Sequence, residues 1–413
     1  ADPQPDGSYK VFGTKIFITY GEHDMAENIV HLVLARVAGA PEGVKGISLF
    51  VVPKFLVNKD GSLGARNDVH CVSIEHKMGI KASPTAVLQY GDNGGAIGYL
   101  VGEENRGLEY MFIMMNAARF AVGMQGVAIC EAATQKAVQY AKDRTQGKAP
   151  GWTGSGMSPI IEHPDVARML VTMKALTQGS RAICYVCAHA TDMSHHADGD
   201  EARHWAERAA LLTPIAKSFA TDAGVDVASL GIQTHGGMGF IEETGAARYW
   251  RDSRIAPIYE GTNGIQALDL LGRKVLGSQG KLLRGFTKIV HKFCAANAEH
   301  AQLKAYVAQL NQLNQEWGEL TTRVGMAAMK NPDEVGAAAV DYLMYSGYII
   351  LAYLWLRMAI AALAHDDTEF AKAKLATCDF YFKRLLPRTA THRAAVEAGS
   401  ECLMSLPAES FAL

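Results

Sequence analysis

The hydrophobic period of this chain changes once, near Glu103, and that change decides what the chain can fold into. Before it, short segments rich in Val, Ile, Phe and Thr are separated by clusters of Gly, Pro and Asp, which is typical of a β-sandwich or barrel. After it, apolar residues recur three and four positions apart, which is the period of an amphipathic helix. The sequence therefore predicts an α+β fold, mostly α, with its strands in the first part of the chain.

Four segments of that first part are predicted to be strands: residues 9–20, 28–37, 46–55 and 85–90. The opening "ADPQPDGSYK" is polar and is unlike a secretory signal peptide. The first strand follows it without a lead-in segment. We therefore expect that an N-terminal portion is missing from the chain.

The helical part begins with four predicted long helices, which suit a four-helix bundle. The first covers residues 107–144, and the second runs from Pro164, a good first-turn residue, to about residue 192. The third covers about 201–230, and the fourth follows Glu260. The residues expected on the apolar face of the fourth helix are Ile265, Leu268, Leu271 and Val275.

These patterns divide the chain into a partial β-barrel or sandwich domain over residues 1–101, a four-helix bundle over 102–278 and a helical C-terminal extension over 279–413. The most apolar stretch of the extension, Tyr342 to Leu356, is shorter than the roughly 18–20 residues that cross a bilayer. We expect it to be a buried helix and predict no membrane span.

Charge and cysteine usage exclude several classes of function. The net charge of −2 leaves no basic surface for nucleic acid. The seven cysteines are scattered rather than arranged as a disulfide framework, which indicates a reducing compartment such as the cytoplasm. Cys184 and Cys187 form a C-x-x-C pair within a helical pattern. They have no second Cys pair, so core packing is favoured over redox or zinc chemistry and no metal site is predicted.

Glu260 is the acid with the most unusual position, because it stands between an apolar loop and the start of the fourth helix. Thr262 or Asn263 is the expected N-cap of that helix. The helix dipole favours an ionised carboxylate there, whereas the apolar neighbours favour the neutral acid. Those opposed effects suit a general base, but an acid that only stabilises the helix start has the same pattern.

Two further segments have more than one interpretation. The glycines of "QTHGGMGF", residues 233–240, end a helix in a turn or allow a ligand close to the backbone. They do not follow a strand, which excludes a Rossmann motif. Arg119, on an apolar helix face, must be paired, bind an anion or extend to solvent. For Arg144 at a helix end, the simpler interpretation is that it complements the helix dipole.

Four motifs in this order, "GTKIFIT", "QTHGGMGF", "RDSRIAPIYEG" and "YEGT", resemble those of the acyl-CoA dehydrogenase family. The resemblance extends from residue 1 to about Val275. The remainder is similar to the extension of the larger bacterial branch, which includes enzymes of long-chain and methylthiopropanoyl-CoA thioesters. The family's N-terminal helical domain and its "T-E-P-x-x-G-S-D" flavin loop have no counterpart here, which again implies a truncated chain.

The resemblance implies an FAD-dependent α,β-dehydrogenation of an acyl-CoA. Glu260 is then the base that removes the α-proton, while the β-hydrogen leaves as hydride to flavin N5. A backbone N–H at the base and a flavin hydroxyl hold the thioester oxygen in the family. Gly261 lets the substrate lie against the backbone. One sub-branch has its base just before the bundle arginine, but Ala118 occupies that position here.

The resemblance also implies residues that bind cofactor and substrate. The residues matching FAD contacts are Phe17, Ile18, Thr19, Arg144, Gln146, Gln233, Gly236, Gly237, Thr262 and Asn263. Those matching substrate contacts are Asn116, Arg119 and Gly261. Several FAD contacts come from a neighbouring subunit in the family, so a homodimer or higher oligomer that shares the FAD site is expected.

The expected electron acceptor is electron-transfer flavoprotein, and the expected location is the bacterial cytoplasm. Two other functions remain open at this point. A flavin oxidase on the same fold would react directly with oxygen. A non-catalytic helical scaffold would retain the motifs but have no need of a base at Glu260. The length and branching of the acyl group cannot be predicted from these residues.

Overall fold

The computed structural model describes residues 1–412, which form two compact units. The first unit is Ala1–Ala117, and the second begins at Ala118. The division lies inside the long helix α1 (Gly107–Asp143), so each unit contains part of that helix. The sequence patterns predict a first boundary between residues 101 and 102. The two units are described separately below.

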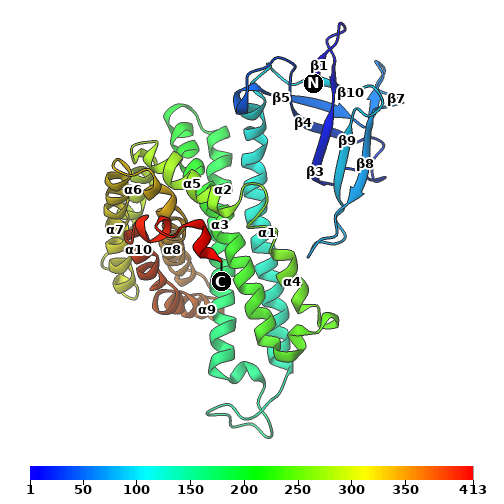
Figure 1. The fold of residues 1–413 in the computed structure, drawn as a ribbon. Coiled ribbons are helices and arrows are strands. Elements are labelled where there is room, and N and C mark those ends of the chain that lie inside the picture. Colours follow the sequence, from blue (N-terminus) through cyan, green and yellow to red (C-terminus); the bar gives the residue numbers. More distant parts are fainter. Residues whose placement is uncertain (413) are drawn as a thin grey trace. The chain divides into compact units, whose positions relative to one another are not determined.

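The first unit is built from antiparallel strands (Figure 1). Its strands are β1 (Asp2–Pro3), β2 (Tyr9–Val11), β3 (Gly13–Thr19), β4 (Val30–Arg36), β5 (Ile47–Pro53), β6 (Phe55–Val57), β7 (Leu63–Arg66), β8 (Val69–Ile74), β9 (Thr85–Tyr90) and β10 (Ala96–Leu100). They form a five-stranded sheet in the order β1-β2-β10-β5-β4, a three-stranded sheet in the order β3-β9-β8, and the β6-β7 pair. A short 3₁₀ turn, η1 (Gly43–Gly46), precedes β5.

All four predicted segments contain strands, but residues 9–20 form two of them, β2 and β3, which lie in different sheets. Apolar residues of these segments are buried in one core. That core includes Val11, Val33, Phe50, Val52 and Leu88. Strands β8 and β10 were not predicted, since polar residues and glycines interrupt their apolar pattern. The expected sandwich-like character of this unit is therefore correct.

The second unit is helical. Its α-helices after α1 are α2 (Pro164–His196), α3 (Gly199–His235), α4 (Ala246–Ser253), α5 (Asn263–Leu268), α6 (Lys281–Ala296), α7 (Lys304–Ala328), α8 (Asp333–Leu363), α9 (Thr368–Phe380), α10 (Arg388–Glu397) and α11 (Glu401–Met404). Two π-helical segments, η5 (Asp269–Leu276) and η6 (Tyr381–Leu385), extend α5 and α9. Short 3₁₀ turns are η2 (Ile160–Glu162), η3 (Gly236–Phe240), η4 (Glu242–Thr244) and η7 (Ala408–Phe411).

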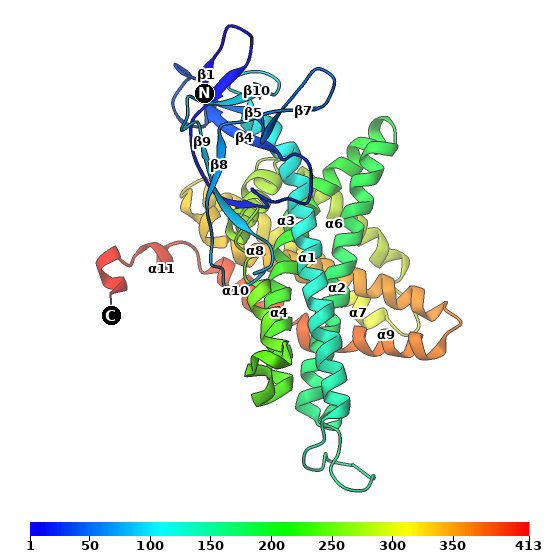
Figure 2. The same ribbon diagram turned by 90° about the vertical axis from the view of Figure 1, so that its right-hand side faces the viewer.

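The three long helices α1, α2 and α3 lie side by side, as Figures 1 and 2 both show. A Cβ added to Gly126 of α1 would lie 2.5 Å from the carbonyl oxygen of Ala220 in α3, so the two backbones approach closely because glycine is present. Pro164 occupies the first turn of α2, as predicted. Cys184 and Cys187 are buried in the helical core, and burial raises the pKa of Cys184 to about 12. Core packing of this pair is thus confirmed.

The fourth helix follows Glu260 as predicted, but the prediction was wrong for half of its apolar face. Helix α5 covers only Asn263–Leu268 before the π-helical segment η5 begins. Ile265 and Leu268 are 46% and 40% exposed, while Leu271 and Val275 are fully buried. A π turn contains more residues than an α turn, so the buried face shifts relative to a constant helical period.

The apolar stretch Tyr342 to Leu356 lies within α8, which is longer than the stretch itself. By length and composition alone, α1 and α8 could each cross a membrane, and 72% of the apolar window of α8 is buried inside the protein against 28% for α1. Helix α8 packs against α2 and α3 of the bundle and α7 and α10 of the extension. One buried core therefore passes through both, without a break at residue 278.

Candidate active site

Glu260 lies on a short loop, residues 254–262, between α4 and α5. Its φ angle is +54° and that of Gly261 is +85°, so two consecutive residues have left-handed backbone. Such a conformation is strained for a glutamate and persists only where the surroundings fix it. We call this segment the Glu260 loop.

Hydrogen bonds close the Glu260 loop on itself. The N–H of Tyr259 donates to the carbonyl of Ile255 at 3.0 Å, and the N–H of Asn263 donates to the carbonyl of Pro257 at 2.9 Å. The Tyr259 hydroxyl donates to the side chain of Gln125 on α1. Thr262 is the N-cap, since its hydroxyl accepts from the N–H of Ile265 at 3.2 Å. One of the two predicted caps is therefore correct.

Gly261 is required at its position for two reasons. Its positive φ disfavours any residue with a Cβ. A Cβ there would also lie 2.6 Å from Nε2 of Gln266 and 3.9 Å from the guanidinium of Arg119. Gln266 is fully buried beneath the loop, and its amide makes no hydrogen bond with residues 1–412.

Arg119 is buried beside the Glu260 loop and forms an ion pair. Its Nη1 lies 3.5 Å from Oδ2 of Asp269, which is also buried and lies 3.5 Å from Arg273. Ion pairing, one of the three interpretations of Arg119, is thus confirmed, and substrate contact stays a prediction. Asn116, on the same helix, is exposed.

The side chain of Asn263 points to α3 rather than into solvent. Its Oδ1 accepts from Nζ of Lys217 at 2.8 Å, and its Nδ2 donates to Oδ1 of Asp222 at 2.7 Å and to Oγ1 of Thr221 at 3.0 Å. The amide therefore has little capacity left for the FAD contact that the sequence suggested. Lys217 is fully buried, and the sequence analysis did not single it out.

Five of the predicted cofactor residues line one cleft of about 800 Å³, here called the Arg144 cleft. These residues are Arg144, Gln146, Gln233, Gly236 and Gly237. Residues that sequence reasoning missed also line it, among them Tyr140, His163 and His235.

One wall of the Arg144 cleft is the end of α3. The helix ends at His235, and Gly236 follows with a φ of +59°, so the helix-ending turn is confirmed. A Cβ on Gly236 or Gly237 would meet no atom of the described residues within 4 Å. His235 stacks on Tyr140 with ring centroids 4.4 Å apart, and burial lowers its pKa.

The loop between α1 and α2 also lines the Arg144 cleft. The N–H of Gln146 donates to the carbonyl of Ser158 at 3.0 Å, and the N–H of Ser158 donates to the carbonyl of Gly147 at 2.9 Å. The ring Nε2 of His163 lies 2.9 Å from the carbonyl oxygen of Gln146. This backbone ladder fixes the loop, while Arg144 and Gln146 themselves are exposed. The cleft thus presents polar side chains from a fixed backbone.

The remaining predicted cofactor residues belong to the first unit, on β3. Pairing of β3 with β9 is irregular between Lys15 and Ile18, and Phe17 in this bulge has a φ of +59°. The Phe17 side chain is 69% exposed and Thr19 is exposed, whereas Ile18 packs against the core of the sheets. The bulge therefore directs an aromatic ring outward.

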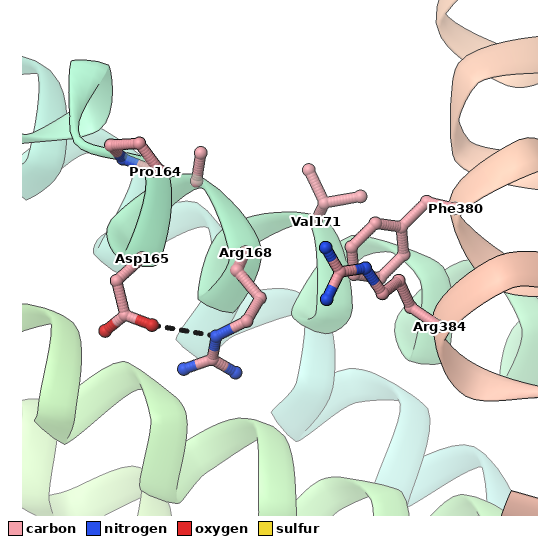
Figure 3. A pocket seen from close by; sticks show the side chains of 7 residues that line it. Pro164, Asp165, Arg168, Val171, Phe380 and Arg384 are labelled. Carbon is pink, nitrogen blue, oxygen red and sulfur yellow. Dashed lines mark hydrogen bonds and ion pairs between the residues drawn. The ribbon is translucent and has the colours of Figure 1, made fainter. Parts of the chain in front are cut away.

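A further pocket of about 480 Å³ lies between the start of α2 and the end of α9 (Figure 3). Nε of Arg168 donates to Asp165 at 2.8 Å on one side, and Arg384 extends from η6 on the other. None of the site residues predicted from the sequence lines this pocket. The residues drawn there are Pro164, Asp165, Ala167, Arg168, Val171, Phe380 and Arg384.

Residues 105–276 match a family model described as "Acyl-CoA dehydrogenase, C-terminal domain", and residues 286–407 match "Acetyl-CoA dehydrogenase C-terminal like". The chain is 48% identical over 410 residues to 3-methylmercaptopropionyl-CoA dehydrogenase of Ruegeria pomeroyi, covering 98% of this chain and 69% of that relative. The chain belongs to the acyl-CoA dehydrogenase family. The resemblance found in its motifs is confirmed.

Solved structures agree with this acyl-CoA dehydrogenase fold. Caenorhabditis elegans ACDH-11 in complex with C11-CoA matches with a TM-score of 0.78 at 23% identity, over 97% of this chain and 64% of that one. An acyl-CoA dehydrogenase of Bacillus anthracis complexed with FAD matches with a TM-score of 0.77 at 23% identity, over 98% and 66%. The chain thus spans about two thirds of the length of the proteins it matches.

Proposed function

We propose that this protein is an FAD-dependent enzyme that converts an acyl-CoA thioester to the trans-2-enoyl-CoA. Family membership supports this class of reaction. The observation that carries the proposal for this chain is Glu260, a half-buried carboxylate on a loop with left-handed backbone, beside a glycine that admits no side chain. Such strain is retained at sites where a reactive group must be held in one position.

Glu260 is proposed to remove the α-proton of the thioester. A thioester α-proton is a weak acid, so the charge that develops on the carbonyl oxygen needs a hydrogen-bond donor. The backbone N–H of Glu260 is proposed to be that donor. Gly261, which lacks a side chain, allows the acyl group to lie against the loop. The ion pair between Arg119 and Asp269 holds α1 against the start of η5 beneath this loop.

The residues of the Arg144 cleft fit part of an FAD molecule. The guanidinium of Arg144 is exposed and suits a pyrophosphate, which it contacts through charge-assisted hydrogen bonds. Gly236 and Gly237 leave open space for a ligand against the end of α3. Phe17, Ile18 and Thr19 are proposed to line the flavin ring. Bound FAD would supply the acceptor for the β-hydrogen. Sharing of this cofactor between subunits, and hence a homo-oligomer, is part of the proposal.

The substrate class is proposed to be an acyl-CoA thioester. The relative from Ruegeria pomeroyi is named for 3-methylmercaptopropionyl-CoA, so that thioester is the first to test. The structure of ACDH-11 is a complex with C11-CoA, which makes a longer linear thioester the second. Electron-transfer flavoprotein as the acceptor and the cytoplasm as the location are further parts of the proposal.

The test is an absorption spectrum of the purified protein, recorded under nitrogen before and after each thioester. Flavin bands that bleach with one thioester support the proposal. A flavin that no thioester bleaches, or a protein that retains no flavin, would contradict it and favour a scaffold. Rapid oxygen consumption with substrate in the absence of an acceptor would instead identify a flavin oxidase.

A further inference from the structure

We propose that Lys217 and Asp222 of α3 are positioning residues that hold the Glu260 loop in its reactive conformation through the side chain of Asn263. The inference rests on the proposed role of Glu260 as the base. It assigns Asn263 a function other than cofactor binding, and it gives the buried lysine a role in the reaction.

Lys217 and Asp222 bind the two ends of the Asn263 amide, and we call this arrangement the clamp. Oδ1 accepts from the Lys217 ammonium at 2.8 Å, and Nδ2 donates to the Asp222 carboxylate at 2.7 Å. Thr221 completes the cluster at 3.0 Å from Nδ2. Hydrogen bonds to charged groups are about twice as strong as those between neutral groups, so this amide is held in one orientation.

Lys217 is unusual because its side chain is completely buried. Its exposure is 0%, and lysine is almost never fully buried unless it is paired. Burial lowers its pKa to about 8, while Asp222 and, more weakly, Glu260 raise it and Arg119 lowers it further. Three elements therefore face this one ammonium: α3 itself, α1 and the Glu260 loop.

Asp222 is the second charged end of the clamp. Burial and, more weakly, the charge of Asp226 raise its pKa to about 6, while Asn263, Lys217 and Arg254 lower it. A half-buried carboxylate that keeps its charge needs such partners. Lys217 and Asp222 thus compensate each other across the Asn263 amide, which lies between them.

The clamp acts on the loop because Asn263 is the residue at which the loop ends. Its backbone N–H closes the loop onto Pro257 at 2.9 Å, and Glu260 lies between these two residues. Helix α3 is 37 residues long and packs against α2 and α8, so it is a rigid support. With Asn263 fixed to α3, the left-handed backbone at Glu260 is fixed as well.

The first test exchanges the amide of Asn263 and the carboxylate of Asp222. Asn263→Asp places a carboxylate against Asp222, and we expect it to slow flavin bleaching by about 10²-fold, the loss that a misplacement of about 1 Å produces. In the double variant with Asp222→Asn, the new amide at position 222 can donate to the new carboxylate at position 263. The bleaching rate should then return to within about threefold of the parent. Thioester affinity should stay within about threefold in all variants, since the clamp does not contact the ligand.

The second test removes the lysine. Lys217→Met should slow bleaching by at least about tenfold and increase deuterium uptake of residues 257–263, which is read without substrate. The matched control is Lys374→Met on α9, where the ammonium donates to the amide oxygen of Gln178 at the same distance of 2.8 Å. The control should leave both readouts unchanged. If Lys217→Met fails to fold, Thr221→Val removes a neutral member of the same clamp.

The outcomes separate this inference from the proposed function. Variants that lose thermal stability but keep the parental bleaching rate and deuterium uptake would overturn the clamp. Failure of the double variant to recover would overturn it too. If the parent does not bleach with any thioester, or Glu260→Gln bleaches as fast as the parent, the proposed function fails instead, while the deuterium uptake still reports on the clamp.

Discussion

The Glu260 loop and the Arg144 cleft are two opposite ways to build a site within the same unit. The loop is half-buried, has left-handed backbone and is tied to α3 through a buried lysine. The cleft exposes Arg144 above a fixed backbone and leaves open space at Gly236. A group that removes a proton must be held in one position. A surface that binds a large anionic molecule needs accessible charge instead.

After replacement of Glu260 itself, Gly261→Ala should have the largest effect of the changes considered below. The alanine would have to adopt the positive φ of Gly261, and its Cβ would lie 2.6 Å from the Gln266 amide. The loop must therefore move. We expect bleaching to slow by about 10²-fold and stability to fall by about 1–3 kcal/mol. Stopped-flow absorption and urea unfolding measure the two effects.

Its control is Gly285→Ala, at an exposed position inside α6 where an added Cβ meets no described atom within 4 Å. Alanine there should add about 0.5–1 kcal/mol of stability and leave the bleaching rate alone. Parental bleaching by Gly261→Ala would contradict the account of the loop.

Arg144→Gln should act on the cleft without affecting the loop. Loss of a charge-assisted contact is expected to weaken flavin binding by about ten- to a hundredfold. Equilibrium dialysis with flavin fluorescence measures the affinity. Lys148→Gln, in the same connecting loop but outside the lining of the cleft, should have little effect. Equal losses in both variants would indicate a general charge effect and not a specific contact.

Gln266→Met tests whether the fold needs the side-chain amide of Gln266, which lies beneath the Glu260 loop. The amide is buried without a hydrogen-bond partner among residues 1–412, so an apolar side chain of similar shape should stabilise the fold by about 1 kcal/mol. Gln178→Met, which removes the acceptor of Lys374, should destabilise it. A clear loss of stability in Gln266→Met, measured by urea unfolding, would mean that the amide is satisfied.

The pH dependence of stability tests the burial of Lys217. Burial lowers the pKa of Lys217 to about 8 from its ordinary value of 10.5. Between these two pH values the unfolded chain binds the proton and the folded chain does not, so this group makes stability rise with pH. Lys217→Met should lack that rise. Urea unfolding from pH 8 to pH 10.5 measures the difference in the free energy of unfolding between the parent and Lys217→Met. That difference would stay constant over this range if the folded lysine titrated normally.

The sequence was sufficient for the elements whose hydrophobic period is regular. Helices α1, α2 and α3 and strands β3, β4, β5 and β9 lie where alternation or helical spacing predicted them. Five of the residues that line the Arg144 cleft were proposed from motifs and not from periodicity, and their contact with FAD stays a prediction. The end of α3 at Gly236 followed from glycine chemistry alone.

What escaped prediction depends on local backbone and on contacts between distant residues. The π-helical segment η5 changes the residues per turn after Leu268, and no feature of the apolar pattern shows that change. The left-handed backbone at Glu260 is also invisible in the sequence, because glutamate has no preference for it. Lys217 did carry a signal: a lysine inside the apolar run "LLTPIAKSFA" is expected to be buried and paired.

The most direct test of the central claim is the single-turnover rate of flavin bleaching in Glu260→Gln. The variant keeps the shape of the side chain and removes the carboxylate that accepts the α-proton. With 3-methylmercaptopropionyl-CoA under nitrogen, we expect the rate to fall by about 10²–10⁴-fold while thioester binding is retained. A variant that bleaches at the parental rate would contradict the assignment of Glu260 as the base.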